Sequence, residues 1–302
     1  MSEPYAFGAS ERAALDAFAA ELVDRLGDDG VVVLAPLDVE ATLGLWRLVA
    51  EVSPRLDSNR ADDLAGGDTD AGLVPTCVML DPWYNKGVGG ERDDYDDYIT
   101  GLLTAAAPVA PHVYLWGFPE IIARFVDRIP EPLELEAWLT WYYKNNPSVI
   151  RGWRSAQMTC LHLKAPDGVM HPEAFLNEAQ LAKKEAGKLR YLPGPPSVIE
   201  AGLLVGFIGR AEQTGHPSQK PVKVYDPLVQ MATIEGDLVL DPMCGSGTTG
   251  AVARATGRRA VLADVSDEYV GQVERRLGIT RVEVPAAVRA LVDPASGPSP
   301  NL

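Results

Sequence analysis

The chain has 302 residues, of which 46% are hydrophobic, so it is long enough to build one large α/β domain around a sizeable core. No apolar run approaches the roughly 20 residues of a membrane-spanning helix, and Met1 to Ser10 lacks the features of a signal peptide. We therefore expect a soluble, cytoplasmic protein. The cysteines, Cys77, Cys160 and Cys244, lack the spacing of a disulfide framework or a zinc site, so no metal is expected.

The formal net charge of −15 is unfavourable for binding nucleic acid, because phosphate contacts dominate such affinity. The charge is unevenly distributed, however. Residues 1–143 contain 9 Lys/Arg against 26 Asp/Glu, whereas residues 144–223 contain 11 against 6. A basic central segment favours docking of a polyanion, with a solvated Lys/Arg face as the open alternative.

Apolar periodicity and turn residues predict the elements in chain order. Helices are expected over 10–26, 39–52 and 120–128, and strands over 30–36, 77–80, 113–117, 135–144 and 158–164, with a surface loop over 53–75. Residues 166–215 combine lysines with prolines and fit an inserted recognition segment better than a sheet unit. Residues 222–278 then read as helix, strand, glycine loop, helix, strand and helix, which is a βαβ unit.

The glycine loop follows the short apolar strand 238–240 and contains Gly245, Ser246, Gly247 and Thr248 in a GxGxxG pattern. Its glycines permit a tight turn and let backbone N–H groups approach a ligand at a helix N-terminus. Asp264 ends the next strand, 19 residues after Gly245, where a carboxylate can accept hydrogen bonds from ribose hydroxyls. Asp241 precedes the turn and would repel a pyrophosphate but attract the cationic amine of a methionine. The loop thus favours S-adenosylmethionine over a dinucleotide, and a purely structural turn is the alternative.

A second loop, DPWYNKG from Asp81 to Gly87, follows the apolar strand 77–80. The exocyclic amine of a nucleobase is a poor nucleophile because its lone pair is delocalised into the ring. The Asp81 carboxylate and the Pro82 carbonyl can accept its two hydrogens and aim the lone pair at a sulfonium methyl. Tyr84 would stack on the base once it is flipped out of the duplex. If the two strands are neighbours, both loops form one site, because ligands bind at the carboxyl ends of strands.

These residues resemble the amino-methyltransferases of DNA, which carry a (D/N/S)PP(Y/F/W) loop and an FxGxG loop. The resemblance runs from about Thr76 to Leu277. HPSQKP at 216–221 matches the HPxQKP element of that family, and DPMCGSGTT at 241–249 matches its DPFxGSGTT. WYYKNNP at 141–147 is similar to the strand and loop that follow the family's catalytic half. The order of catalytic loop, recognition segment and cofactor loop is the β-type permutation. Trp83 replaces the second Pro of the catalytic loop, and Met243 replaces the Phe near the cofactor.

The resemblance implies an α/β, class I S-adenosylmethionine-dependent methyltransferase fold, Rossmann-like, with a seven-stranded, mostly parallel sheet. It implies catalytic roles for Asp81, Pro82 and Tyr84, and cofactor contacts from Asp241, Met243, Gly245, Ser246, Gly247, Thr248, Asp264, Ser218 and Lys220. Double-stranded DNA is the expected partner, while a homodimer and a restriction partner are left open. The expected division is an N-terminal extension (1–75), a catalytic half (76–165), a target-recognition segment (166–215), a cofactor half (216–285) and a tail (286–302).

Adenine is favoured over cytosine because the catalytic loop begins with Asp rather than Ser. One rival is a nicotinamide-dependent oxidoreductase with the same glycine loop, which leaves DPWYNKG and HPSQKP unexplained. The other is a non-catalytic relative in which Trp83 closes the pocket and the basic segment, with Lys183, Lys184 and Lys188, binds nucleic acid or a protein. If these lysines form only a solvated face, Arg151, Arg154 or Arg210 must supply the phosphate contacts.

Overall fold

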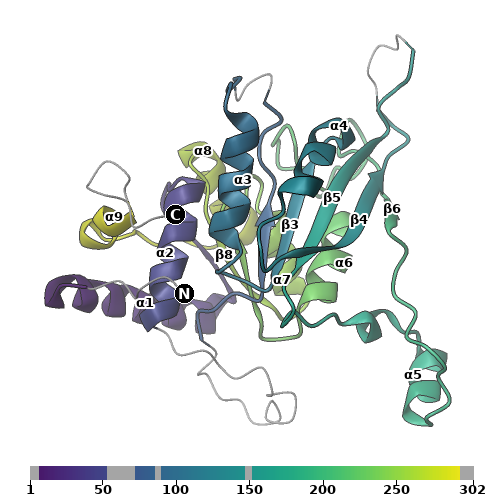
Figure 1. Ribbon diagram of the computed structural model, residues 1–302, viewed down its shortest axis with the longest axis horizontal. Coiled ribbons are helices and arrows are strands. Elements are labelled where there is room, and N and C mark those ends of the chain that lie inside the picture. Colours follow the sequence, from purple (N-terminus) through teal and green to yellow (C-terminus); the bar gives the residue numbers. More distant parts are fainter. Residues whose placement is uncertain (1–6, 53–71, 86–89, 147–151, 293–302) are drawn as a thin grey trace.

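A computed structural model describes residues 7–52, 72–85, 90–146 and 152–292. Figure 1 shows a central twisted sheet with helices on both faces. Most of the loop predicted over 53–75, together with Lys86, Gly87, Pro147, Arg151 and the end of the C-terminal tail, lies outside the described residues.

In the described part of the chain, the sheet has eight strands in the order β1-β8-β7-β2-β3-β5-β4-β6. The strands are β1 (Val31–Val33), β2 (Cys77–Leu80), β3 (His112–Gly117), β4 (Glu134–Tyr142), β5 (Gln157–Lys164), β6 (Val198–Glu200), β7 (Leu238–Asp241) and β8 (Arg259–Leu262). Among these strands, β5 alone runs antiparallel to its neighbours, β3 and β4, and the other pairings are parallel. The expected α/β fold with a mostly parallel sheet is therefore confirmed.

The number of strands differs from the seven that the resemblance implies. The eighth strand is β6, three residues of the segment 166–215 that pair in parallel with Thr140 to Tyr142 of β4. A strand this short follows a proline-rich stretch and carries no alternation long enough to identify it from sequence. At the other end of the sheet, β1 comes from the segment 1–75 and pairs with β8.

The helices divide between the two faces of the sheet. Their bounds are α1 (Ala9–Asp29), α2 (Val39–Val52), α3 (Tyr95–Ala106), α4 (Pro119–Ile122) with the 3-10 turn η3 (Ala123–Arg128), η4 (Pro172–Phe175), α5 (Glu178–Glu185), α6 (Val222–Ala232), α7 (Thr248–Ala255), α8 (Asp267–Leu277) and α9 (Ala286–Val292). The first four helices and α9 cover one face, while α6, α7 and α8 cover the other. The short turn η4 and helix α5 contain no buried residue. Within the described ranges, no helix combines the length and the apolar character needed to cross a membrane.

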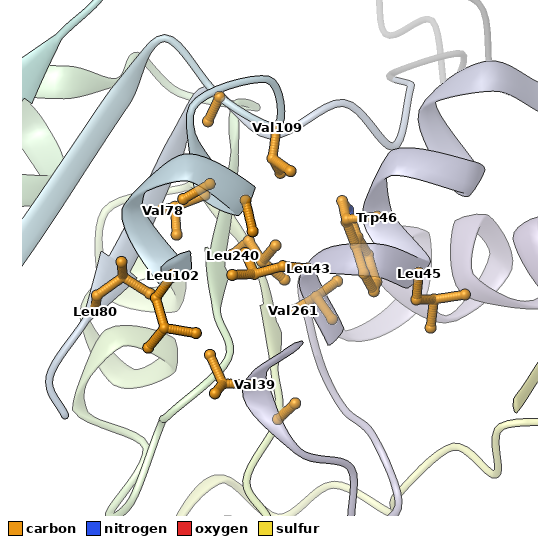
Figure 2. Close-up of a cluster of buried hydrophobic side chains, with 14 of the residues drawn as sticks. Val39, Leu43, Leu45, Trp46, Val78, Leu80, Leu102, Val109, Leu240 and Val261 are labelled. Carbon is orange, nitrogen blue, oxygen red and sulfur yellow. The ribbon is translucent and has the colours of Figure 1, made fainter. Parts of the chain in front are cut away.

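The core follows from the alternation of side chains along the buried strands. Val78 and Leu80 of β2 point to the face of α2 and α3, whereas Cys77 and Met79 point to the face of α6. In Figure 2, Trp46 and Leu43 of α2 lie against this strand layer. The indole N–H of Trp46 donates to the Leu73 carbonyl at 3.1 Å, which satisfies the polar atom of a fully buried ring.

The strand directions define a catalytic edge, which we take as the edge where β2, β3, β7 and β8 end. Two antiparallel pairings make β4 parallel to β3, so β4 and β6 also end at this edge. Strand β5 begins there and ends at the opposite edge. The segments after β2, β4, β6, β7 and β8 therefore gather on one side of the sheet, which is where ligands bind in open α/β folds.

Candidate active site

The two loops expected to form one site lie side by side. Strand β2 pairs in parallel with β7, with Cys77 opposite Val239 and Val78 opposite Leu240. The two strands therefore end side by side, β2 at Leu80 directly before Asp81 and β7 at Asp241. The condition for a single site, that the strands preceding the two loops are neighbours, is therefore met.

A buried ion pair joins the catalytic loop to the HPSQKP segment. The ammonium of Lys220, whose residue is only 3% exposed, donates to Oδ2 of Asp81 and, at 3.2 Å, to the hydroxyl of Tyr84. It also lies 5.8 Å from the ring centroid of Trp116. Burial alone would lower the pKa of Lys220, but Asp81 and Tyr84 outweigh burial and raise it. Lys220 is therefore charged, and it fixes the Asp81 carboxylate in one orientation.

The second oxygen of that carboxylate has no partner in the part of the chain that the structure describes. Within the described residues, Oδ1 of Asp81 is a buried atom that accepts no hydrogen bond. An unsatisfied buried acceptor carries a desolvation cost of about 1–3 kcal/mol, so native proteins keep few of them. A donor supplied by a ligand would remove that cost. Lys220 thus fixes Oδ2 of Asp81, whereas Oδ1 can accept a hydrogen bond from a ligand.

Trp83 points away from the available oxygen. Its ring packs on Tyr95 and Tyr98 of α3, with centroids 5.4 and 5.5 Å away, and the Tyr95 hydroxyl donates to the Trp83 carbonyl at 2.6 Å. Asn85 holds the end of the loop at φ 52°, with its side chain bonded to both backbone groups of Arg92. The replacement of the second Pro by Trp therefore anchors the loop to α3, which argues against the hypothesis that Trp83 closes the pocket.

Tyr84 faces the opposite way, toward Lys220. Its ring lies 4.7 Å from that of Phe118, and its hydroxyl donates to the sulfur of Met158 at 3.8 Å. Burial raises the pKa of Tyr84 to about 12, so the phenol is neutral. These contacts hold the ring next to Asp81, while stacking on a base stays a prediction.

Asp264 supports the glycine loop. Its carboxylate accepts the backbone N–H of Gly245 and that of Ser266, both at 2.9 Å. It lies two residues beyond the end of β8 rather than at the end of the strand. Both oxygens retain lone pairs, so the side chain can still accept hydroxyl groups of a ribose.

Asp241 is a buried carboxylate without an ion pair among the described residues. It accepts the Thr249 hydroxyl at 2.5 Å and the backbone N–H of Met243 at 3.2 Å. Burial raises the pKa of Asp241 to about 7. A cationic amine beside it would compensate that burial, so the glycine loop and its two carboxylates suit S-adenosylmethionine, which carries a ribose and a cationic amine.

Gly245 and Gly247 are each favoured because a side chain at either position would clash with a different neighbour. A Cβ at Gly245 would lie 2.8 Å from Nε2 of His216, and one at Gly247 would lie 2.9 Å from Cγ2 of Val273. Both have positive φ, 46° and 75°. A side chain at Gly247 would therefore meet α8.

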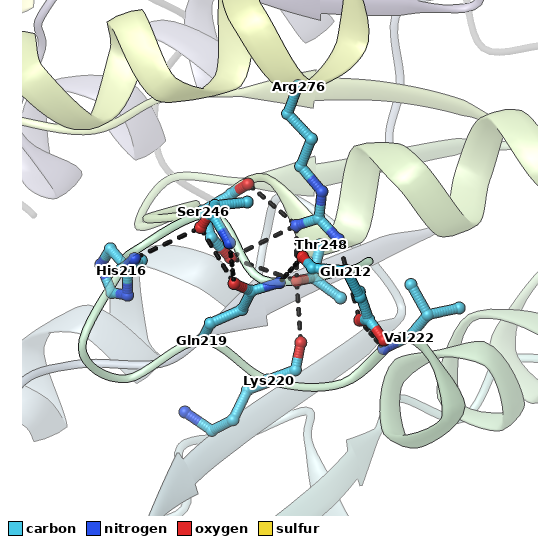
Figure 3. Close-up of polar contacts among 9 residues, drawn as sticks. Glu212, His216, Gln219, Lys220, Val222, Ser246, Thr248 and Arg276 are labelled. Carbon is cyan, nitrogen blue, oxygen red and sulfur yellow. Dashed lines mark hydrogen bonds and ion pairs between the residues drawn. The ribbon is translucent and has the colours of Figure 1, made fainter. Parts of the chain in front are cut away.

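A polar network that sequence reasoning missed ties the glycine loop to the HPSQKP segment (Figure 3). The guanidinium of Arg276 donates to the carbonyl of Ser246 at 2.9 Å and the hydroxyl of Thr248 at 3.0 Å, and Thr248 donates to the Lys220 carbonyl at 2.9 Å. Glu212 accepts the N–H of Val222 at 2.6 Å. Arg276 gives no sequence signal, because an arginine near a helix C-terminus is ordinary.

The remaining predicted cofactor residues differ in their burial. Ser218 is exposed, and its N–H donates to His216 at 3.2 Å. Gln219, within the same segment, is buried and bonds to Thr214 and to the Glu212 carbonyl. The ammonium of Lys220 contacts the catalytic loop, so the cofactor role predicted for Lys220 and Ser218 stays a prediction.

Comparison with known proteins supports the resemblance. A family model described as DNA methylase matches residues 195–275. The type II methyltransferase M.HpaI of Haemophilus parainfluenzae is 26% identical over 216 residues, covering 66% of this chain and 67% of that protein. The DNA adenine methyltransferase YhdJ of Escherichia coli K12 is 41% identical over 115 residues, which span 35% of this chain and 39% of YhdJ.

The fold has a counterpart among solved structures. The crystal structure of the M1.HpyAVI-SAM complex covers 82% of this chain and all of its own, with a TM-score of 0.56 and 18% identity, which is a likeness of fold. The matched region of the family model contains β6, the HPSQKP segment and the glycine loop. Over residues 195–275, the chain is therefore similar to the DNA methylases of the N6/N4 family model.

Proposed function

We propose that the protein transfers a methyl group from S-adenosylmethionine to the exocyclic amine of a base flipped out of double-stranded DNA, with adenine preferred. The observation that carries the proposal is the Asp81 carboxylate. Lys220 holds one of its oxygens while the other is buried without a partner among the described residues, next to a glycine loop on the neighbouring strand. A hydrogen-bond donor that arrives with the substrate would complete this arrangement.

The cofactor is assigned to the glycine loop. Asp264 would accept the ribose hydroxyls, and Asp241 would neutralise the methionine amine, while Gly245 to Thr248 would form the floor of the site. When bound, the cofactor supplies an electrophilic methyl group on a sulfonium. The M1.HpyAVI structure, which is described as a SAM complex, has the same fold and supports this assignment.

The base is assigned to the catalytic loop. Asp81 Oδ1 and the Pro82 carbonyl would accept the two amine hydrogens, which turns the lone pair toward the methyl group. The ring of Tyr84 would stack on the flipped base. The methylated amine must lose one proton, which Oδ1 of Asp81 would receive. Orientation and preorganised charge, rather than a strong base, would supply the rate.

The route of the DNA is assigned to the catalytic edge. Arg154, in the segment between β4 and β5, and Arg210, after β6, are exposed and belong to segments that leave the sheet at this edge. The lysines of α5 follow the C-terminal end of β5, at the opposite edge. Since β5 has eight residues and strands rise about 3.3 Å per residue, roughly 26 Å separates the two edges there.

Adenine is preferred because the loop begins with Asp, and the similarity to a DNA adenine methyltransferase supports this choice. Nucleoside analysis of DNA methylated by the purified protein would test it, with N6-methyladenine expected. N4-methylcytosine as the product would reverse the preference and leave the proposed chemistry intact.

Titration calorimetry tests the cofactor assignment. We expect binding of S-adenosylhomocysteine and no measurable binding of NAD. Asp264→Ala should weaken S-adenosylhomocysteine binding, because the substitution removes the acceptor for the ribose hydroxyls. Tight NAD binding by the parent protein would overturn the assignment, and unchanged S-adenosylhomocysteine affinity in Asp264→Ala would remove Asp264 from the cofactor site.

A further inference from the structure

The segment after β6 carries an apolar tip whose side chains belong to no core cluster of the described residues. Phe207 is 90% exposed, and its neighbours Val205 and Ile208 are also exposed large apolar residues. Phe207 and Ile208 lie between Gly206 and Gly209, both with positive φ near 60°. Scattered apolar surface residues are normal, but three within four positions on one short loop form a local protrusion.

The protrusion is held in shape by polar contacts at its base. Both side-chain groups of Asn145 bond to the backbone of Leu203, at 2.9 and 2.8 Å. The amide of Gln213 donates to the Ile208 carbonyl at 2.8 Å and to the Gly206 carbonyl at 3.2 Å. These bonds satisfy the backbone of the loop and leave the phenyl ring as its most exposed apolar side chain. The backbone that carries the ring therefore loses little conformational entropy when the ring meets a partner.

The protrusion belongs to the catalytic edge. It follows β6, which ends at that edge, and it leads within the chain to Glu212 and then to Lys220, the partner of Asp81. Arg210, directly after Gly209, is exposed and adds positive charge to the tip. An exposed phenyl ring can stack on DNA bases while the neighbouring arginine contacts a phosphate. DNA therefore matches this pair of side chains better than water or an acidic protein surface does.

We propose that Phe207 is a wedge that enters the DNA duplex at the position vacated by the flipped base. This inference rests on the proposed function. A flipped base leaves a gap in the stack, and unstacking costs a few kcal/mol for each step. A phenyl ring that fills the gap recovers part of that cost and stabilises the extrahelical base in the site. Val205 and Ile208 flank the ring and contact the adjacent base pairs.

The test compares Phe207→Ala with the parent on two duplexes that contain the mapped methylation site. One duplex is fully paired, and in the other the nucleotide opposite the target is abasic, so that the base flips at little cost. We expect kcat/KM of Phe207→Ala to fall at least about tenfold on the paired duplex and much less on the abasic one. Phe207→Trp should retain most of the activity, because a ring is kept.

Val169→Ala is the matched control. Val169 is 55% exposed and follows β5 at the opposite edge, so its substitution removes a comparable apolar side chain and should change neither rate. Equal losses on both duplexes, or none, in Phe207→Ala would overturn the wedge. If the parent protein methylates no DNA, the proposed function is overturned instead. Normal S-adenosylhomocysteine affinity in Phe207→Ala serves as the control that this variant is folded.

Discussion

Two lysine-bearing regions of this molecule place the same side chain in opposite environments. At the catalytic edge, Lys220 is buried and contacts a carboxylate, a phenol and an indole ring. On α5, Lys183 and Lys184 are exposed, and within the described residues neither forms an ion pair. Figure 1 shows α5 set apart from the sheet at the end of extended segments. A buried lysine fixes the orientation of the groups that it contacts, whereas an exposed lysine acts mainly through its charge.

The difference separates two kinds of function. A buried ion pair costs desolvation and is retained where it fixes an orientation, as it does for Asp81. Exposed lysines contribute little to stability but attract phosphate, with a strength that depends on salt. We therefore expect substitution of the buried Lys220 to affect turnover and folding, and substitution of the exposed lysines of α5 to affect only DNA affinity.

The largest effect is expected from Asp81→Ala. Loss of the carboxylate removes the acceptor that orients the base amine, so kcat should fall by at least about 100-fold, the scale of removing one preorganised polar group. The affinity for S-adenosylhomocysteine should stay close to that of the parent. Single-turnover methyl transfer at saturating cofactor measures the first quantity, and near-normal turnover would remove Asp81 from the chemistry.

Lys220→Met tests whether the ion pair acts as a unit. The variant leaves the Asp81 charge buried without its partner, so the free energy of unfolding should fall by about 3–5 kcal/mol and turnover should fall with it. The double variant Asp81→Asn with Lys220→Met should recover much of the stability but none of the activity. Urea denaturation of the parent, of Asp81→Asn, of Lys220→Met and of the double variant gives the coupling energy between the two side chains.

Lys183→Met is the control for that experiment. An exposed lysine without an ion pair should change the free energy of unfolding by less than about 0.5 kcal/mol. A loss in Lys183→Met as large as that in Lys220→Met would mean that burial does not distinguish the two regions.

A smaller effect is expected from pH on cofactor binding. Burial raises the pKa of Asp241 to about 7, and a cationic amine binds only the charged carboxylate, so affinity should be full above pH 7 and fall by up to about tenfold per unit below it. Burial also raises the pKa of Asp264, so Asp241→Asn should weaken the pH dependence without abolishing it. Calorimetric titration with S-adenosylhomocysteine above and below pH 7 measures the pH dependence of affinity in the parent and in Asp241→Asn. The same pH dependence in both proteins would exclude Asp241 from the amine site.

The smallest effect is expected from the lysines in and after α5. Charge reversal at Lys183, Lys184 and Lys188 should weaken DNA binding less than reversal at Arg154 and Arg210, which belong to the catalytic edge. Each phosphate that is no longer neutralised should flatten the log–log salt slope by nearly one unit. Fluorescence anisotropy at low salt resolves the difference, since the net charge of −15 keeps non-specific binding weak. A larger loss of affinity from the lysine variant would place the DNA at the opposite edge.

Sequence patterns predict the elements that carry strong local signals. Helix α2 matches the predicted range 39–52, and the buried strands β2 and β7 lie where their apolar runs place them. The site loops are identifiable because Asp-Pro and glycine-rich turns have specific backbone requirements. That β2 and β7 are neighbours is only a conditional expectation from sequence, because strand order is set by tertiary packing.

Other features depend on contacts between distant parts of the chain. The ion pair of Lys220 with Asp81 joins residues 139 positions apart, and the hydrogen bonds of Arg276 bridge 30 positions to Ser246. Strand β6 exists because β4 presents an edge for it, and Trp83 turns toward α3 because Tyr95 and Tyr98 receive its ring. No local pattern encodes such partners, so a sequence without alignment cannot identify them.

Base-resolved methylation mapping of DNA from cells that express the protein tests the central claim most directly, because it surveys every base without assuming a target sequence. Cells that express the parent protein should carry a methylated exocyclic amine at one recurring sequence, predominantly on adenine. Cells that express Asp81→Ala at the same level should lack that mark. Unmethylated DNA in cells with folded, cofactor-binding parent protein, or an equal mark with Asp81→Ala, would contradict the account.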